Sequence, residues 1–155
     1  MGAGDPSEMR YATPPLRRVA TRLLAHEMGG QPATAESLAA ASGRLLDRLS
    51  ARLGEVIGPA GVRAIFLRAV KLRSTEFPFL DERIVPESQG ESLAESLRAR
   101  LQGQQTEGIQ EASVILFATF AGVLAAVIGD RLTWSLLQQI WPDTLPEAEL
   151  QEIEE

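Results

Sequence analysis

Residues 112 to 129 read ASVILFATFAGVLAAVIG, and this uncharged stretch decides how the rest of the chain is arranged. Only Ser113 and Thr119 are polar, and both hydroxyls can bond back to carbonyls of their own helix. A helix that is apolar on every side must be covered on every side. After a two-residue break, the segment LTWSLLQQIW (132–141) predicts a second, shorter helix. We therefore expect a long central helix, a tight turn and a return helix.

Either protein or lipid can cover this stretch. Its eighteen uncharged residues reach the minimum length of a membrane span. Protein is favoured because nine of the eighteen are Ala, Gly, Ser or Thr, and because Ala118, Gly122 and Ala126 form a flat face for close helix contact. No Lys/Arg cluster beside the stretch would orient it in a membrane. We interpret it as a buried core helix and keep, as an alternative, a hydrophobic hairpin over 112–141 that inserts into membranes.

The composition excludes several classes of functional site. The chain has 155 residues, enough for one domain with a substantial core. It has no cysteine, which excludes disulfides, thiolate metal ligands and thiol nucleophiles. Its single histidine excludes a histidine-rich metal site, and no Gly-rich phosphate loop or nucleophile elbow occurs. We therefore expect no enzymatic activity, no cofactor and no metal. The N-terminus lacks the apolar run of a secretory signal, which predicts a cytoplasmic protein.

Charge is divided unevenly along the chain. Residues 1–75 carry 11 Lys/Arg and 6 Asp/Glu, whereas residues 76–155 carry 4 and 15. The two parts have net charges of +5 and −11. These opposite charges attract each other, either within one fold or across a dimer. Because the whole chain has a net charge of −6 and a pI near 4.9, we do not expect a nucleic-acid partner.

Local signals predict where the remaining helices begin and end. Thr13, Thr34 and Ser92 are residue types that cap helix N-termini, and Pro59 suits a first helical turn. Apolar residues spaced by three and four then predict helices at 15–28, 35–57, 59–75, just after Ser92, and at 107–128 with Thr106 as its cap. On the 35–57 helix, we expect Val56 to lie on the buried apolar stripe.

These elements predict an all-α fold, a bundle of five or six helices around the central hydrophobic helix at 107–128. The domain spans 13–142, residues 1–12 are expected to be disordered, and the acidic tail 143–155 is expected to be frayed or a short helix. The plan resembles globin-like, Bcl-2-like and colicin-type bundles in architecture, and a shared architecture does not carry function.

An internal repeat is a further hypothesis. Val-Ile-Gly occurs at 56–58 and again at 127–129, an offset of 71 residues. At the same offset, leucines of the 35–57 helix match Leu or Phe in the central helix. Any two helical hairpins share leucine spacing and a terminal Gly, so coincidence and duplication both fit. A true duplication predicts two hairpins packed about a pseudo-two-fold axis.

Four basic residues on the 59–75 helix, Arg63, Arg68, Lys71 and Arg73, are candidates for contact with a partner. An acidic protein surface or a phosphate group would fit them. The alternative is an ordinary solvated helix face, paired weakly with the acidic half of the chain.

Trp134 and Trp141 lie seven residues apart on the last helix, which places them on one side of it. Tryptophan is enriched at the centres of protein interfaces, so the pair is a candidate dimer anchor. Tryptophan is also highly buried on average, so we favour a position in the core of the domain for this pair.

His26-Glu27 resembles the start of the histidine-kinase H-box over these two residues, and this resemblance implies phosphotransfer through His26. The alternative is that His26 interacts favourably with the helix C-terminus, just before the Gly-Gly stop. Together these observations favour a non-enzymatic interaction or regulatory protein whose partner is another protein or itself, as a homodimer. Membrane insertion and phosphotransfer are the two alternatives.

Overall fold

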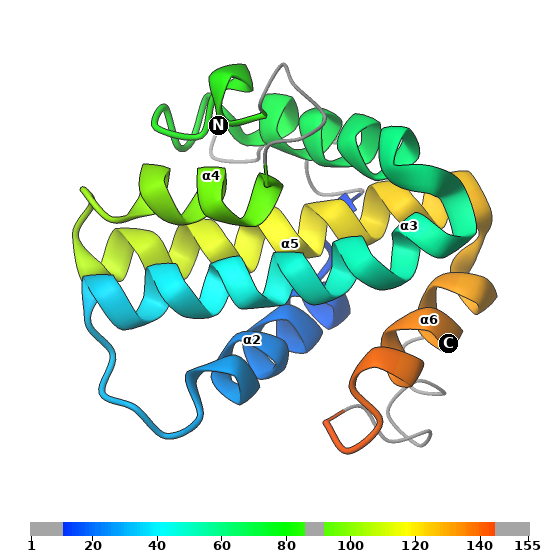
Figure 1. The fold of residues 1–155 in the computed structure, drawn as a ribbon, viewed down its shortest axis with the longest axis horizontal. Coiled ribbons are helices and arrows are strands. Elements are labelled where there is room, and N and C mark those ends of the chain that lie inside the picture. Colours follow the sequence, from blue (N-terminus) through cyan, green and yellow to red (C-terminus); the bar gives the residue numbers. More distant parts are fainter. Residues whose placement is uncertain (1–10, 86–91, 145–155) are drawn as a thin grey trace.

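The computed structural model describes residues 11–85 and 92–144, and within these residues the chain is helical, without a strand. Five α-helices pack together, and one of them is bent into two segments. In chain order the elements are α2 (Pro14–Met28), α3 (Ala35–Arg73), the short 3-10 helix η1 (Glu82–Ile84), α4 (Leu93–Leu101), α5 (Thr106–Ile128) and α6 (Asp130–Ile140) (Figure 1). The predicted fold class, an all-α bundle of five or six helices around a central hydrophobic helix, is confirmed.

Most helix ends follow from local capping chemistry. The Thr13 hydroxyl accepts a hydrogen bond from the Leu16 N–H, and Thr34 and Ser37 bond reciprocally at the start of α3. Thr106 was expected to cap α5, and this was wrong. It is the first residue of the helix, and Gln105 precedes it without a side-chain bond.

The long helix α3 breaks at Gly58, which has φ 82° and ψ 156°. Glycine adopts this conformation readily because it has no Cβ, and the following Pro59 lacks an N–H for the preceding turn. The break divides α3 into a first segment, 35–57, and a second segment, 59–73, which runs back along the bundle (Figure 1). The predicted break at Gly58 is confirmed, and the second segment ends two residues before the expected 75.

The first segment of α3 and α5 form the centre of the bundle. They pack against each other and run in the same direction (Figure 1). Helix α2 packs mainly against α5, and α4 packs against α3. Helix α5 is long and apolar enough to cross a membrane by length and composition, and 61% of its most apolar 18-residue window is buried in the bundle. Val56 is 43% exposed, so the expectation that it lies on the buried stripe was wrong.

The two halves of the bundle have matching backbone features at the offset of 71 residues. Gly129, between α5 and α6, has φ 95° and ψ 153°, close to the values at Gly58. The buried hydroxyls of Ser42 and Ser113, also 71 residues apart, form a 2.8 Å hydrogen bond with each other. Helices α2 and α4 lie on opposite sides of the central pair (Figure 1). This is the arrangement expected for two similar units about an approximate two-fold axis between the long helices.

Tyr11 and Ala12, which precede the expected domain boundary at residue 13, are packed against the bundle. Ala12 is buried, and its carbonyl accepts a 3.0 Å hydrogen bond from Arg17 Nε. The Tyr11 backbone lies directly over Gly122 of α5, where a Cβ would overlap it. Tyr11 and Ala12 were expected to be disordered, and they pack here because Gly122 has no side chain. Residues 1–10 and 145–155 of the two predicted tails lie outside the described residues.

Candidate interaction surface

The structure separates the four basic residues of the second α3 segment. Arg68 and Lys71 are exposed, Arg63 is half-buried, and Arg73 is buried. Lys71 Nζ lies 3.8 Å from Glu82 Oε2 of η1, which is a solvent-exposed ion pair and therefore a weak one. The four side chains consequently do not form one continuous basic surface.

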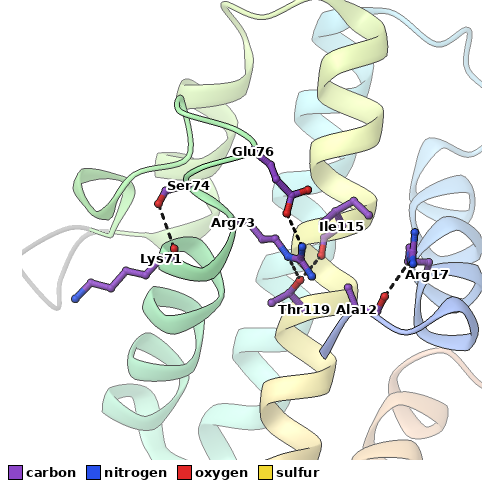
Figure 2. A network of polar contacts seen from close by, with 8 residues as sticks. All are labelled: Ala12, Arg17, Lys71, Arg73, Ser74, Glu76, Ile115 and Thr119. Atoms are coloured by element: carbon purple, nitrogen blue, oxygen red, sulfur yellow. Dashed lines mark hydrogen bonds and ion pairs between the residues drawn. The ribbon is translucent and has the colours of Figure 1, made fainter. Parts of the chain in front are cut away.

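Arg73 belongs to the core (Figure 2). Its Nε donates a 2.7 Å hydrogen bond to Thr119 Oγ1 of α5, and its Nη1 lies 2.6 Å from Glu76 Oε1. The Thr119 hydroxyl in turn donates to the Ile115 carbonyl. The buried guanidinium therefore joins α3 to α5. The prediction that Arg73 contacts an acidic partner was wrong, because its side chain lies in the core.

Trp134 and Trp141 are 4% and 1% exposed, so the core interpretation of this pair is the one that the structure supports. As packed, neither indole presents a face to a partner. The Trp141 Nε1–H donates a 3.1 Å hydrogen bond to Glu27 Oε2 of α2, which attaches the end of α6 to α2.

Glu27 is the centre of a polar cluster with Trp141, Arg44 and Arg48. Its carboxylate is almost fully buried, with Arg48 Nε at 3.0 Å and Arg44 Nε at 3.7 Å. Arg44 also donates a 2.6 Å hydrogen bond to the Glu27 carbonyl. This Glu27 cluster joins α2, α3 and the end of α6. His26 lies exposed beside it, and the Glu27 carboxylate is engaged in the interior, so the two residues do not form one site. Phosphotransfer through His26 stays a prediction.

A different surface contains the exposed apolar side chains. Among the described residues, three large hydrophobic side chains are exposed: Val56 at 43%, Val127 at 64% and Leu132 at 44%. Ile57 and Ile128 beside them are half-buried. We call Val56, Val127 and Leu132 the tip surface, because they flank Gly58 and Gly129, the two turns at one end of the bundle (Figure 1).

The helix geometry explains why this surface is at one end. The two long helices run in the same direction and touch at Ser42 and Ser113, and each Gly turn comes sixteen residues after its serine. Both turns therefore lie at the same level of the bundle, about 24 Å from the serine contact at 1.5 Å per residue. At this level α2 and α4 no longer cover the long helices (Figure 1).

A short motif in the sequence marks this surface. Val-Ile-Gly occurs at both turns, and its valine lies near the end of a long helix, beyond the region that neighbouring helices cover. Helical spacing assigned Val56 to the buried stripe, because spacing describes the face of a helix and not how far along it the cover extends.

One partly exposed carboxylate away from the tip has a shifted pKa. The hydrogen bond from the Arg83 side chain lowers the pKa of Asp81 below its ordinary value, and Arg100 adds to this effect. Asp81 also accepts from the Arg83 N–H at the start of η1, so the pair organises the connection between α3 and α4.

Comparisons with protein-family models, with curated proteins and with solved structures found no match.

Proposed function

We propose that this chain is a non-enzymatic protein-interaction module that self-associates through the tip surface. The observation that carries the proposal is the position of Val56, Val127 and Leu132, the exposed large hydrophobic side chains among the described residues, which all lie within three residues of Gly58 or Gly129 at one end of the bundle. Single exposed hydrophobic residues are ordinary, whereas several at one place mark contact surfaces.

The energetic reason is the removal of apolar surface from water. Each Å² of apolar surface that a partner covers contributes about 25 cal/mol. Val127, nearly two-thirds exposed, would lose the most apolar surface to a partner, and its neighbour Ile128 is half-buried beside it. The tip residues also belong to helices rather than to a long loop, so less backbone entropy is lost on contact.

The test is sedimentation equilibrium of the full chain over a range of concentrations, without detergent. The proposal predicts that the mass rises from 16.8 kDa towards twice that value as concentration increases. Val127→Asp should prevent the rise, because a charge at the contact must be desolvated. Ala33→Asp adds the same charge at an exposed site before α3, at the opposite end of the bundle, and should not affect it. A wild-type chain that stays monomeric at every concentration would refute the proposal.

A membrane-inserting hairpin is the second candidate, and two observations favour it. Helix α5 has a mean hydropathy of 2.1 over an 18-residue window, and the α5–α6 turn is flanked by exposed Val127 and Leu132. An apolar turn is the part of a hairpin that would meet a bilayer first. Insertion would also break the buried bonds from Ser113 and Thr119 to α3.

Vesicle flotation distinguishes the two candidates. The hairpin predicts that the chain floats with phosphatidylcholine vesicles and that the fluorescence of the buried Trp134 and Trp141 changes on binding. The interaction module predicts that the chain stays in the aqueous fraction with unchanged fluorescence.

A further inference from the structure

We propose that a groove beside the tip binds a small organic cation that carries an apolar group, and that the Asp130 carboxylate holds its charged end. The groove lies between the start of α2, the last turns of α5 and the start of α6. Its volume is about 440 Å³, within the range of about 300–1,000 Å³ that small-molecule sites occupy. The tip-surface residues do not line it, so this site does not depend on the proposed self-association.

The floor of the groove is made of small residues. Gly122, Ala125 and Ala126 of α5 line it, and none has a side chain larger than a methyl group. The Tyr11 backbone fills the position above Gly122, whereas Ala125 is half-buried and Ala126 is exposed. The face of small side chains that the sequence predicts for close helix contact is therefore covered at Gly122 and open one turn later.

The walls of the groove are apolar and aromatic. Tyr11, Pro15 and Leu16 line it on the α2 side, and Trp134 lines it on the α6 side. Trp134 is 4% exposed, so packing fixes the indole and only a small part of it borders the groove. A ligand's apolar group would be removed from water against these side chains, and aromatic rings also attract cations. The walls therefore suit a ligand with a substantial apolar part.

Asp130 supplies the charge of the site. It is the one charged residue among the described residues that line the groove. Asp130 is exposed, and its side chain forms no ion pair or hydrogen bond with another described residue. The Thr13 hydroxyl, also in the lining, already accepts a hydrogen bond from the Leu16 N–H. A carboxylate without a partner in this groove selects a cation, because charge-assisted hydrogen bonds are the strongest that it can accept.

The positive charges near Asp130 do not cancel its carboxylate. Asp130 is the first residue of α6, where the helix dipole contributes roughly half a positive charge, so the full negative charge remains the larger. Arg131 is exposed and does not line the groove, so water and salt screen its charge. Arg17 is also outside the lining, and its Nε donates a 3.0 Å hydrogen bond to the Ala12 carbonyl (Figure 2). The groove therefore keeps a net negative charge.

The lining favours an organic cation over a metal ion or an anion. Ca²⁺ and Mg²⁺ take about six or more oxygen ligands, whereas the described lining offers a single carboxylate. An anion would face that carboxylate without a basic residue in the described lining. An ammonium group on a hydrocarbon ring or chain, in contrast, uses both the carboxylate and the apolar walls. We therefore assign the groove to ligands of this chemical class.

The first experiment compares three probes that share one ring and differ in charge: benzylammonium, benzyl alcohol and benzoate. Each is titrated into the full chain at neutral pH, and binding is measured by saturation-transfer NMR. Benzylammonium should bind with a Kd of about 1 mM, as expected for a ligand this small. Benzyl alcohol should bind at least about fivefold more weakly, because it lacks the charge, and benzoate more weakly still. Equal binding of the three probes would overturn the assignment.

The second experiment changes the groove. Asp130→Asn keeps the shape of the side chain and should weaken benzylammonium binding about fivefold to tenfold, with benzyl alcohol unaffected. Glu111→Gln removes the same charge from an exposed position near the other end of α5 and should bind both probes like the wild type. Ala126→Leu, which fills the exposed floor, should weaken both probes. Unchanged benzylammonium binding in a folded Asp130→Asn variant, checked by circular dichroism, would show that the carboxylate does not hold the cation.

The chain's own Arg10 is the other cation to test, because it directly precedes Tyr11 at the edge of the groove. Arg10→Gln should leave the binding of benzylammonium unchanged if the groove takes a separate ligand. Tighter binding of benzylammonium to Arg10→Gln than to the wild type would show that Arg10 competes for Asp130. That result would overturn the assignment of the groove to a separate ligand.

Discussion

The first segment of α3 and α5 have similar courses but different surroundings. Both are long helices that end at a glycine with φ near +90°, and their serines bond to each other across the centre. On the side away from this contact, α3 carries exposed Arg48 and Ala51, whereas the equivalent positions of α5 hold buried Thr119 and Gly122. One framework thus occurs once as an amphipathic helix with one side in solvent and once as a helix covered on nearly every side.

The difference comes from what lies against each helix. Tyr11 crosses α5 at Gly122, Arg73 reaches Thr119, and α2 packs along the same helix. The corresponding side of α3 faces solvent at Ala51. A shared backbone therefore fixes where the helices run, and the neighbouring segments decide which side chains each helix tolerates.

Thr119→Arg should have the largest effect, because it gives α5 the residue that α3 carries at the equivalent position. The new charge would be buried beside the Arg73 guanidinium without a partner. We expect a loss of more than about 4 kcal/mol in the free energy of unfolding, measured by urea denaturation. A stable Thr119→Arg variant would show that the segments packed over α5 can move away from Thr119 at little energetic cost.

Gly122→Val tests the close approach of the N-terminal segment. Its side chain would overlap the Tyr11 backbone, so the segment must move, at a cost of about 2–3 kcal/mol. Ala51→Val, at the equivalent exposed position of α3, should cost less than about 1 kcal/mol, mainly through helix propensity. The measurement is the urea midpoint of each variant, and equal losses would contradict the proposed difference in cover.

Arg48→Thr gives α3 the residue that α5 carries, and it removes the 3.0 Å contact with the buried Glu27 carboxylate. Arg44 and Trp141 still satisfy that carboxylate, so we expect a loss of about 1–2 kcal/mol. Arg68→Thr, on an exposed part of the second α3 segment, serves as the matched control and should be close to neutral. Thermal melts followed by tryptophan fluorescence would report both changes.

Gly58→Ala and Gly129→Ala test the similarity of the two halves. At φ values of 82° and 95°, an alanine Cβ is strained at both turns, and each substitution should cost about 1–3 kcal/mol. If the turns are equivalent, the two losses in unfolding free energy should agree within about 1 kcal/mol. A loss of unfolding free energy at only one of the two positions would show that the two turns are not equivalent.

The smallest effect is expected at Asp81, in the connection between the halves. Its pKa is lowered by the Arg83 hydrogen bond, so its contribution to stability is present above pH 3.8 and is lost as pH falls through the lower, folded-state pKa. Because its partner Arg83 is exposed to solvent, which weakens the ion pair, Asp81→Asn should lower the melting temperature only slightly at pH 7. The difference from wild type should disappear in strongly acidic buffer, and a difference that grew with acidity would refute this assignment.

The sequence predicted the framework better than the site, for a physical reason. The break at Gly58 and the cap at Thr34 depend on a few neighbouring residues, so local rules placed them correctly. The second break was expected at Asp130-Arg131, and this was wrong, because Gly129 alone makes the turn and Asp130 is already the first residue of α6. The exposure of Val56 and the burial of Arg73 depend on contacts with segments far away in the chain. Periodicity cannot supply those contacts, because it describes one helix at a time. The tip surface was missed for this reason.

The parallel course of the two long helices has a kinetic consequence. Their ends cannot be joined by a short loop, so the chain returns along the second α3 segment and α4 before α5 begins. Contacts at the centre of the bundle, such as that between Ser42 and Ser113, therefore close a loop of 71 residues. Such contacts raise the contact order and impose an entropic cost before the core contacts form. This bundle should consequently fold more slowly than an up-and-down bundle of the same length. During synthesis, the apolar side of α3 lacks its packing partner until α5 has been made.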